Sequence, residues 1–213
     1  MSLFKSSAQS SRETYERWSD FYDHFGPFNN YLEKWDREIL TLAPAAPLLD
    51  IGCGPGRLLN KLLRAGFRDL AGVDIAKAGL LLARQKASPE FADNVLALAE
   101  SAAERLPFRD LSFQSIIISG ALHHLEKPEI VLAECARVLD ISGRLIIADP
   151  YFPPPMRQFI NLMLSVYPIT GDRRFYTASR VTSLASKAGF AKKKMINMPL
   201  AYILVFEKCS SSE

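Results

Sequence analysis

Short apolar runs alternate with helical patterns along most of this chain, and this alternation constrains the fold more than any other feature. We interpret the apolar runs as buried strands, at residues 47–51, 70–73, 95–98, 115–119 and 144–148. Helical patterns lie at residues 57–65, 78–86, 126–139, 156–166 and 178–188. Alternation of this kind predicts a mainly parallel sheet with helices on both faces.

Two more strand-like runs close the pattern, at residues 192–197 and 201–207. So short a connection requires these two strands to be antiparallel. The expected fold class is therefore α/β, a Rossmann-like doubly wound sheet that is mixed at one edge. In such sheets, ligands bind outside the carboxyl ends of the strands, so the chemistry is sought there.

The segment before the first strand is rich in aromatic residues. Residues 13–25 and 29–42 both have helical spacing of large apolar side chains, with a break at Gly26-Pro27. With 213 residues the chain is long enough for one domain. We expect residues 1–43 to form a helical cap, residues 44–208 the main domain, and residues 209–213 a tail.

Composition excludes several other classes of protein. The net charge of +3 is too small to indicate a nucleic-acid partner. The three cysteines form no C-x-x-C pair, so neither a disulfide framework nor a cysteine zinc site is expected, and we expect no metal. No apolar run reaches the roughly 18–20 residues of a membrane span, and the polar N-terminus has no apolar signal region. A cytoplasmic location is expected.

A glycine-rich turn follows the first predicted strand, in the sequence Asp50-Ile-Gly52-Cys-Gly54-Pro-Gly56. Such a turn lets the backbone approach a ligand and points N–H groups at it. The spacing departs from the G-x-G-x-x-G of dinucleotide sites, and the carboxylate of Asp50 favours an ammonium group over a pyrophosphate. Asp74 ends the second strand, where an acid binds ribose hydroxyls. The pattern indicates an adenosine-type ligand with a positive end.

Five stretches carry a resemblance to a known family. They are 48–56 (LLDIGCGPG), 72–75 (GVDI), 103–110 (AERLPFRD), 122–125 (LHHL) and 137–149 (RVLDISGRLIIAD). In this order they resemble the class I S-adenosylmethionine-dependent methyltransferases of the type 11 group. The resemblance implies a seven-stranded sheet in the order 3-2-1-4-5-7-6, with strand seven antiparallel. It also implies an enzyme that uses S-adenosylmethionine and releases S-adenosylhomocysteine.

The resemblance assigns cofactor-binding roles to particular residues of this chain. Gly52 and Gly54 would hold the methionine part and Asp50 its amino group. Asp74 would bind the ribose and Ile75 would pack on the adenine. The remaining residues with implied contacts to the cofactor are Ala103, Glu104, Ser119 and, in the aromatic leader, Tyr22. The acid usual before Ala103 is Ala102 here, so one contact to the adenine is lost or reduced to backbone.

The acceptor side is less defined by the sequence. His123 follows the fourth strand and Asp149 ends the fifth, so they are the candidate catalytic residues, with His123 as a possible general base. A packing role for the histidine pair stays open. We expect residues 13–42 and 150–177 to close an apolar acceptor pocket, whose polar groups would be Tyr22, His123, Asp149, Tyr151 and Tyr176.

Three functions remain after these observations. The first is methyl transfer to a small apolar or amphiphilic acceptor by in-line displacement. The second is a cofactor-binding protein of the same fold with a regulatory role and no catalysis. The third, a nicotinamide oxidoreductase, is disfavoured by the glycine spacing. The sequence leaves open the acceptor, the atom that is methylated and the oligomeric state.

Overall fold

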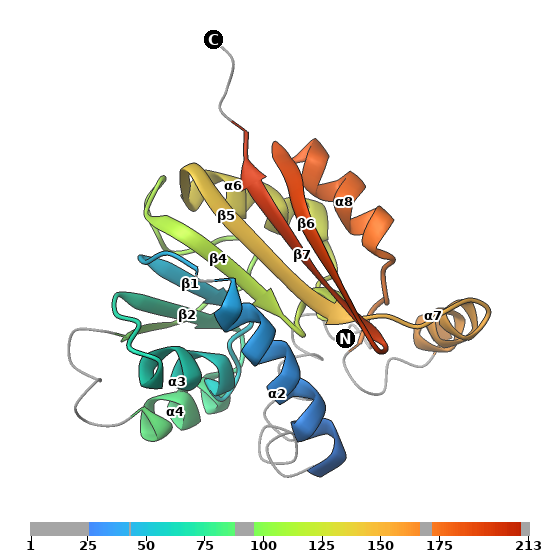
Figure 1. Cartoon of the computed structure of the whole chain (residues 1–213), viewed down its shortest axis with the longest axis horizontal. Coiled ribbons are helices and arrows are strands. Elements are labelled where there is room, and N and C mark those ends of the chain that lie inside the picture. Colours follow the sequence, from blue (N-terminus) through green and yellow to red (C-terminus); the bar gives the residue numbers. More distant parts are fainter. Residues whose placement is uncertain (1–25, 43, 88–95, 167–171, 210–213) are drawn as a thin grey trace, which may run out of the picture.

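The computed structural model describes residues 26–42, 44–87, 96–166 and 172–209. Its centre is a seven-stranded sheet in the order β3-β2-β1-β4-β5-β7-β6 (Figure 1). The strands are β1 (Leu48–Ile51), β2 (Leu70–Asp74), β3 (Leu96–Glu100), β4 (Phe113–Ser119), β5 (Leu139–Pro150), β6 (Phe190–Met198) and β7 (Ala201–Lys208). Strands β1 to β5 pair in parallel, and β7 is antiparallel to both β5 and β6. The predicted fold class is confirmed.

Helices cover both faces of this sheet (Figure 1). They are α2 (Gly26–Thr41), α3 (Arg57–Arg64), α4 (Lys77–Lys86), α6 (Pro128–Val138), α7 (Met156–Val166) and α8 (Ala178–Lys187), with a short 3-10 helix η1 (Leu122–His124). Side chains of α2, α3 and α4 share one apolar core with the sheet, and those of α6 and α8 share a second core on the opposite face. Helix α7 belongs to neither core.

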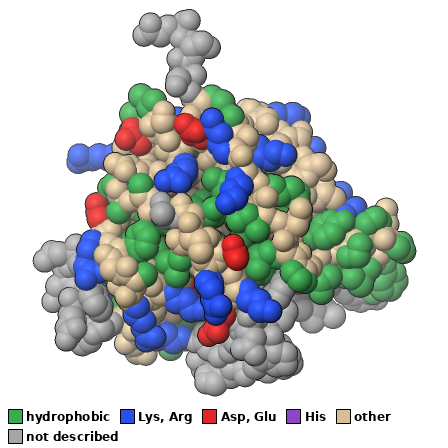
Figure 2. All heavy atoms as spheres, in the orientation of Figure 1, with side chains coloured by type: hydrophobic (Ala, Val, Ile, Leu, Met, Phe, Trp, Pro, Cys, Tyr) green, Lys and Arg blue, Asp and Glu red, His purple; other side chains and the backbone are tan. Residues whose placement is uncertain are grey.

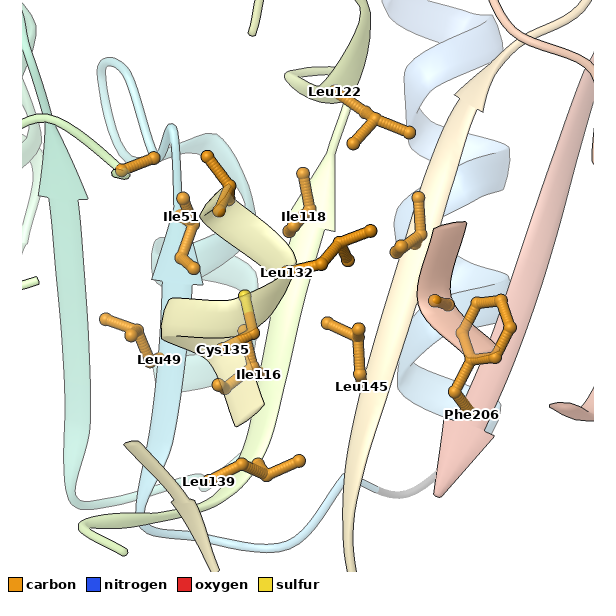
Figure 3. Close-up of a cluster of buried hydrophobic side chains, with 14 of the residues drawn as sticks. Leu49, Ile51, Ile116, Ile118, Leu122, Leu132, Cys135, Leu139, Leu145 and Phe206 are labelled. Atoms are coloured by element: carbon orange, nitrogen blue, oxygen red, sulfur yellow. The ribbon is translucent and has the colours of Figure 1, made fainter. Parts of the chain in front are cut away.

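The central strands are buried on both faces, which explains why they read as continuous apolar runs in the sequence. Successive residues of a strand point to opposite faces. Ile116 and Ile118 of β4 lie in the core under α6, and Ile117 between them lies in the core under α3. Figure 3 shows the first of these cores, in which Leu49, Ile116 and Leu145 from three neighbouring strands meet Leu132 and Cys135 of α6.

The largest differences from the predicted elements are at strand and helix starts. Strand β5 begins at Leu139 instead of residue 144, because the segment after α6 pairs with β4 at Phe113 and includes the tight turn at Ser142 (φ 61°). Helix α2 begins at Gly26, within the predicted break, since proline is tolerated in the first turn of a helix. The predicted helix at residues 13–25 lies outside the described residues.

No helix among the described residues is long and apolar enough to cross a membrane. The division into a cap and a main domain stays a prediction, because residues 1–25 are outside the described part of the chain.

Candidate functional site

A cavity of about 500 Å³ lies at the carboxyl ends of β1, β2 and β4. Its wall includes the glycine loop after β1, Asp74 at the end of β2, and Ser119 at the end of β4. A second part of the wall comes from outside the sheet, from Leu32 and Trp35 of α2. The cavity therefore joins the predicted ligand loop to the N-terminal segment.

The three glycines of the loop have positive φ angles, of 71° at Gly52, 49° at Gly54 and 74° at Gly56, which residues with a side chain rarely adopt. A Cβ at Gly52 would lie 2.5 Å from Ala121 Cβ, closer than two carbon atoms can approach. A Cβ at Gly54 would have no atom within 4 Å. Gly52 is therefore required by packing, whereas Gly54 keeps part of the cavity open.

Asp74 holds the glycine loop against β2. Its Oδ2 accepts a hydrogen bond from the Gly54 N–H and its Oδ1 accepts one from the Ala76 N–H, both at 2.8 Å. Burial raises the pKa of Asp74, while these backbone donors act in the opposite direction. This bond to the loop was not foreseen from the sequence, which indicates a residue's position on a strand but not the direction of its carboxylate.

Asp50 faces the cavity from β1 and is only 3% exposed. Burial raises its pKa to about 8, and the carboxylates of Asp36 and Asp74 add to this effect, while the Arg57 guanidinium opposes it. A buried carboxyl group at the wall of a cavity is stabilised in its charged form by a cationic ligand group. The site is thus suited to a ligand that carries an ammonium group.

An ion-pair cluster attaches α2 to α3, the helix that follows the glycine loop. Asp36 on α2 is fully buried and forms ion pairs with Arg57 and with Lys61, the latter at 2.9 Å. Arg57 also donates to the Leu32 carbonyl at 3.3 Å and lines the cavity. Sequence reasoning missed this cluster, although the basic pair at i and i+4 on α3 was a visible signal.

The acceptor-side candidates are in direct contact. Nδ1 of His123 lies 2.9 Å from Asp149 Oδ1, and its Nε2 lies 3.5 Å from Asp172 Oδ1. The His123 ring also stacks on Phe175 at a centroid distance of 4.9 Å. Burial lowers the pKa of His123, but the carboxylates of Asp149 and Asp172 outweigh it, so the net pKa is raised. The two carboxylates fix both the orientation and the charge of this imidazole.

The described cofactor candidates converge on one cavity. Its wall includes Asp50, Gly52, Gly54, Asp74, Ile75, Ala103, Glu104 and Ser119, together with His123. Tyr22 lies outside the described residues. Asp149 is fully buried and reaches the cavity only through His123. Tyr151 and Tyr176 pack against the core under α6 and are not part of the cavity wall, so the prediction that these three residues line the pocket is wrong.

The two segments predicted to close the pocket do meet there in their described parts. Leu32 and Trp35 represent the first segment, and Phe152, Asp172 and Phe175 the second. Helix α7, however, is absent from the wall, which corrects the expectation that it forms an apolar side of the pocket. The cavity-lining roles of Phe152, Asp172 and Phe175 were not predicted individually, since single residues in an irregular segment have no periodic signal.

Residues 49–147 match a family model described as a methyltransferase domain. The match covers a little under half of the chain, in the part that runs from β1 to β5. The chain is 33% identical to the demethylmenaquinone methyltransferase of Thermus thermophilus over 63% of its own length and 61% of that protein's. It is 28% identical to the 27-O-demethylrifamycin SV methyltransferase of Amycolatopsis mediterranei, over 63% and 56% of the two lengths. It thus spans about three fifths of these relatives.

Solved structures show the same fold at lower sequence identity. A SAM-dependent methyltransferase from Thermotoga maritima, described as a possible histamine N-methyltransferase, aligns with a TM-score of 0.76 and 19% identity, covering 93% of this chain and 99% of that chain. The magnesium protoporphyrin IX methyltransferase of Synechocystis, with SAH bound, aligns with a TM-score of 0.71 and 18% identity, covering 95% and 100%. At these identities the likeness establishes the fold.

Proposed function

We propose that this chain transfers a methyl group from S-adenosylmethionine to a small, apolar or amphiphilic acceptor. One observation carries the proposal: the wall of a single cavity contains both a polar set, formed by Asp50, Asp74 and the glycine loop, which we call its polar half, and large side chains such as Trp35 and Phe152. The polar half fits a charged nucleoside, and the large side chains fit an apolar molecule. The relatives named after demethylmenaquinone and demethylrifamycin support an acceptor of this class.

The residues at the polar half fit S-adenosylmethionine. Gly54 leaves open space for it, Asp50 would bind its ammonium group, and Asp74 its ribose. Ser119 Oγ is buried and has no hydrogen-bond partner among the described residues, so a polar ligand atom would satisfy it. The assignments of Gly52, Ile75, Ala103, Glu104 and Tyr22 to this cofactor are part of the same proposal. When bound, the cofactor supplies a methyl group activated by a sulfonium ion.

On the acceptor side, we assign the catalytic role to His123. Asp149 holds the Nδ1 side of its ring, so the acceptor's proton would go to Nε2, which lies 3.5 Å from Asp172 Oδ1 in this structure. Asp149 is a positioning residue, because it acts through His123. The aromatic wall excludes water and aligns the acceptor, and alignment alone can lower a barrier by roughly 7–11 kcal/mol.

We also propose a cellular location and domain boundaries for this chain. Two of the three cysteines, Cys53 and Cys135, are buried free thiols, which supports a reducing, cytoplasmic environment. We assign residues 1–43 to a cap and residues 44–208 to the methyltransferase domain.

Asp74→Ala should weaken the binding of S-adenosylmethionine by tenfold to hundredfold. The variant leaves ribose hydroxyls unpaired and frees the loop at Gly54, a cost of about 1–3 kcal/mol. Calorimetric titration with S-adenosylhomocysteine measures it, and NAD should show no comparable binding. The matched control is Asp69→Asn, since Asp69 lies just before β2, does not line the cavity, and has a φ of 59° that asparagine tolerates. Unchanged affinity in Asp74→Ala would remove this residue from the site.

His123→Ala should lower kcat about a hundredfold while the affinity for S-adenosylhomocysteine stays within a factor of three, because general-base catalysis typically contributes at least that much. Asp149→Asn should shift the acidic limb of the pH–rate profile to lower pH, since it removes a carboxylate that raises the pKa of His123. A screen of quinone precursors, phenols, phospholipids and amines first identifies the acceptor. Full activity of His123→Ala on that acceptor would assign the histidine to packing.

A further inference from the structure

Helix α7 presents its apolar face to solvent. Its exposed large apolar side chains, which we call the α7 ridge, are Met156, Phe159, Leu162 and Met163, with exposed fractions of 42%, 65%, 62% and 43%. Spacings of three and four residues place them on one side of the helix. Figure 2 shows hydrophobic side chains gathered over this helix. A continuous apolar patch of this kind on a protein surface marks an interaction site.

The side of α7 turned towards the protein holds Asn161 together with the half-buried Ile160 and Leu164. Asn161 donates from Nδ2 to the Phe175 carbonyl at 3.0 Å and accepts from the Phe175 N–H at 2.9 Å. Amphipathic helices of globular proteins normally turn their apolar face inward. The ridge instead lies outside both apolar cores of the described residues, which leaves this apolar surface for a partner.

The charges around the ridge are basic. Arg157 lies on the flank of α7, with its guanidinium 5.9 Å from the Tyr151 ring centroid. Arg173 and Arg174 lie at the other end, where they share a small hollow with Leu162 and Ser165. Residues 150–166 contain no Asp or Glu. The nearest acid in the following described segment, Asp172, is directed at His123 and His124 and away from this surface.

We propose that the α7 ridge docks the protein on an anionic phospholipid surface, with the ridge in the acyl-chain boundary and the three arginines at the headgroups. An apolar stripe with flanking basic residues is the pattern of helices that lie in a membrane interface. A stable dimer needs about 800 Å² from each partner, more than four side chains on an 11-residue helix provide. Two copies meeting face to face would also bring their arginines together.

The docking surface is continuous with the acceptor side of the cavity. The backbone of Phe175 is hydrogen-bonded to Asn161, and its ring stacks on His123. Phe152 packs edge-on against the Phe175 ring, with the ring centroids 4.9 Å apart. This inference rests on the proposed function, because docking would bring the protein to an amphiphilic acceptor that resides in a membrane surface. Docking would place the acceptor half of the cavity beside the lipid.

The test is co-sedimentation of the full chain with vesicles of phosphatidylcholine containing phosphatidylglycerol, compared with pure phosphatidylcholine. The double variant Phe159→Ser/Leu162→Ser should bind the anionic vesicles at least about tenfold more weakly. Arg157→Gln/Arg174→Gln should bind more weakly and lose salt dependence. The matched control is Leu81→Ser/Ile141→Ser, which removes two apolar side chains of similar exposure, 53% and 64%, on other elements.

Three results would overturn the proposal: no sedimentation of the wild-type chain with anionic vesicles, equal binding to pure phosphatidylcholine, or equal losses in the ridge and control variants. A concentration-dependent dimer that the ridge variant abolishes, seen by analytical ultracentrifugation, would assign the ridge to a second copy. Binding of S-adenosylhomocysteine by the ridge variant, measured calorimetrically, should match wild type. This separates a failure of docking from a failure of the proposed function.

Discussion

Asp50→Asn should make the ligand-free protein more stable and at the same time weaken the binding of S-adenosylmethionine by several hundredfold or more. The carboxyl of Asp50 is buried with a pKa of about 8, whereas its ordinary value is 3.8. Between these two values the folded protein keeps a proton that the unfolded chain releases. Stability supplied by this group is therefore fully present below about pH 4 and is lost as the pH rises towards 8.

Asp50→Asn removes this loss of folding stability, since asparagine carries no charge at any pH. Each pH unit between the two pKa values corresponds to about 1.4 kcal/mol, so the roughly four units between them give a gain on the order of 5 kcal/mol at pH 8. Binding changes in the opposite direction, because loss of one partner from a buried ion pair costs about 3–5 kcal/mol. Urea unfolding at pH 5 and pH 8 and calorimetric titration measure the two effects.

Calorimetry in buffers of different ionisation enthalpy adds a second readout. If Asp50 binds the ammonium group, wild type should release a proton on binding at pH 7 and Asp50→Asn should not. The isosteric control Asp69→Asn, at an exposed turn, should change neither property. A lower stability for Asp50→Asn at pH 8 would contradict the assigned charge state of this residue.

Gly52→Ala should destabilise the protein by about 2–4 kcal/mol, through overpacking and a strained backbone. Its new Cβ would lie 2.5 Å from Ala121 Cβ, at a φ of 71°. Gly54→Ala has a positive φ but no atom within 4 Å of the new Cβ, so its cost in stability should be nearer 1 kcal/mol. The same Cβ enters the cavity, so Gly54→Ala should nevertheless lose most of its affinity for S-adenosylhomocysteine.

Two further variants check this reasoning. Gly66→Ala, with φ 92° and open space around the new Cβ, measures the backbone cost by itself, away from the cavity. Ala121→Gly combined with Gly52→Ala relieves the clash and should recover the part of the stability that overpacking removes. Thermal or urea unfolding gives the free energies. Equal stability losses for Gly52→Ala and Gly66→Ala would show that the contact with Ala121 is not limiting.

The sequence pattern by itself determined the fold class and the edge of the sheet where the site lies, whereas the order of the strands was implied by the resemblance to a known family. The reason is that parallel strands buried on both faces must be apolar along their whole length, and that their carboxyl ends meet at one edge. Asp50, the glycine loop and Asp74 therefore had to lie close together, whatever the packing of the helices. The strand pattern alone was enough to place their backbone at this edge of the sheet.

Only the tertiary structure decided how these side chains are used. It directs Asp74 to the Gly54 N–H, places Asp149 behind His123 instead of in the cavity, and turns the apolar face of α7 outward. The contacts of Asp36 with Arg57 and of His123 with Asp172 join residues 21 and 49 positions apart. The periodicity of a segment indicates which face of its helix or strand a residue occupies. It does not indicate which distant residue that side chain contacts, because the contact depends on how the helices and strands pack together.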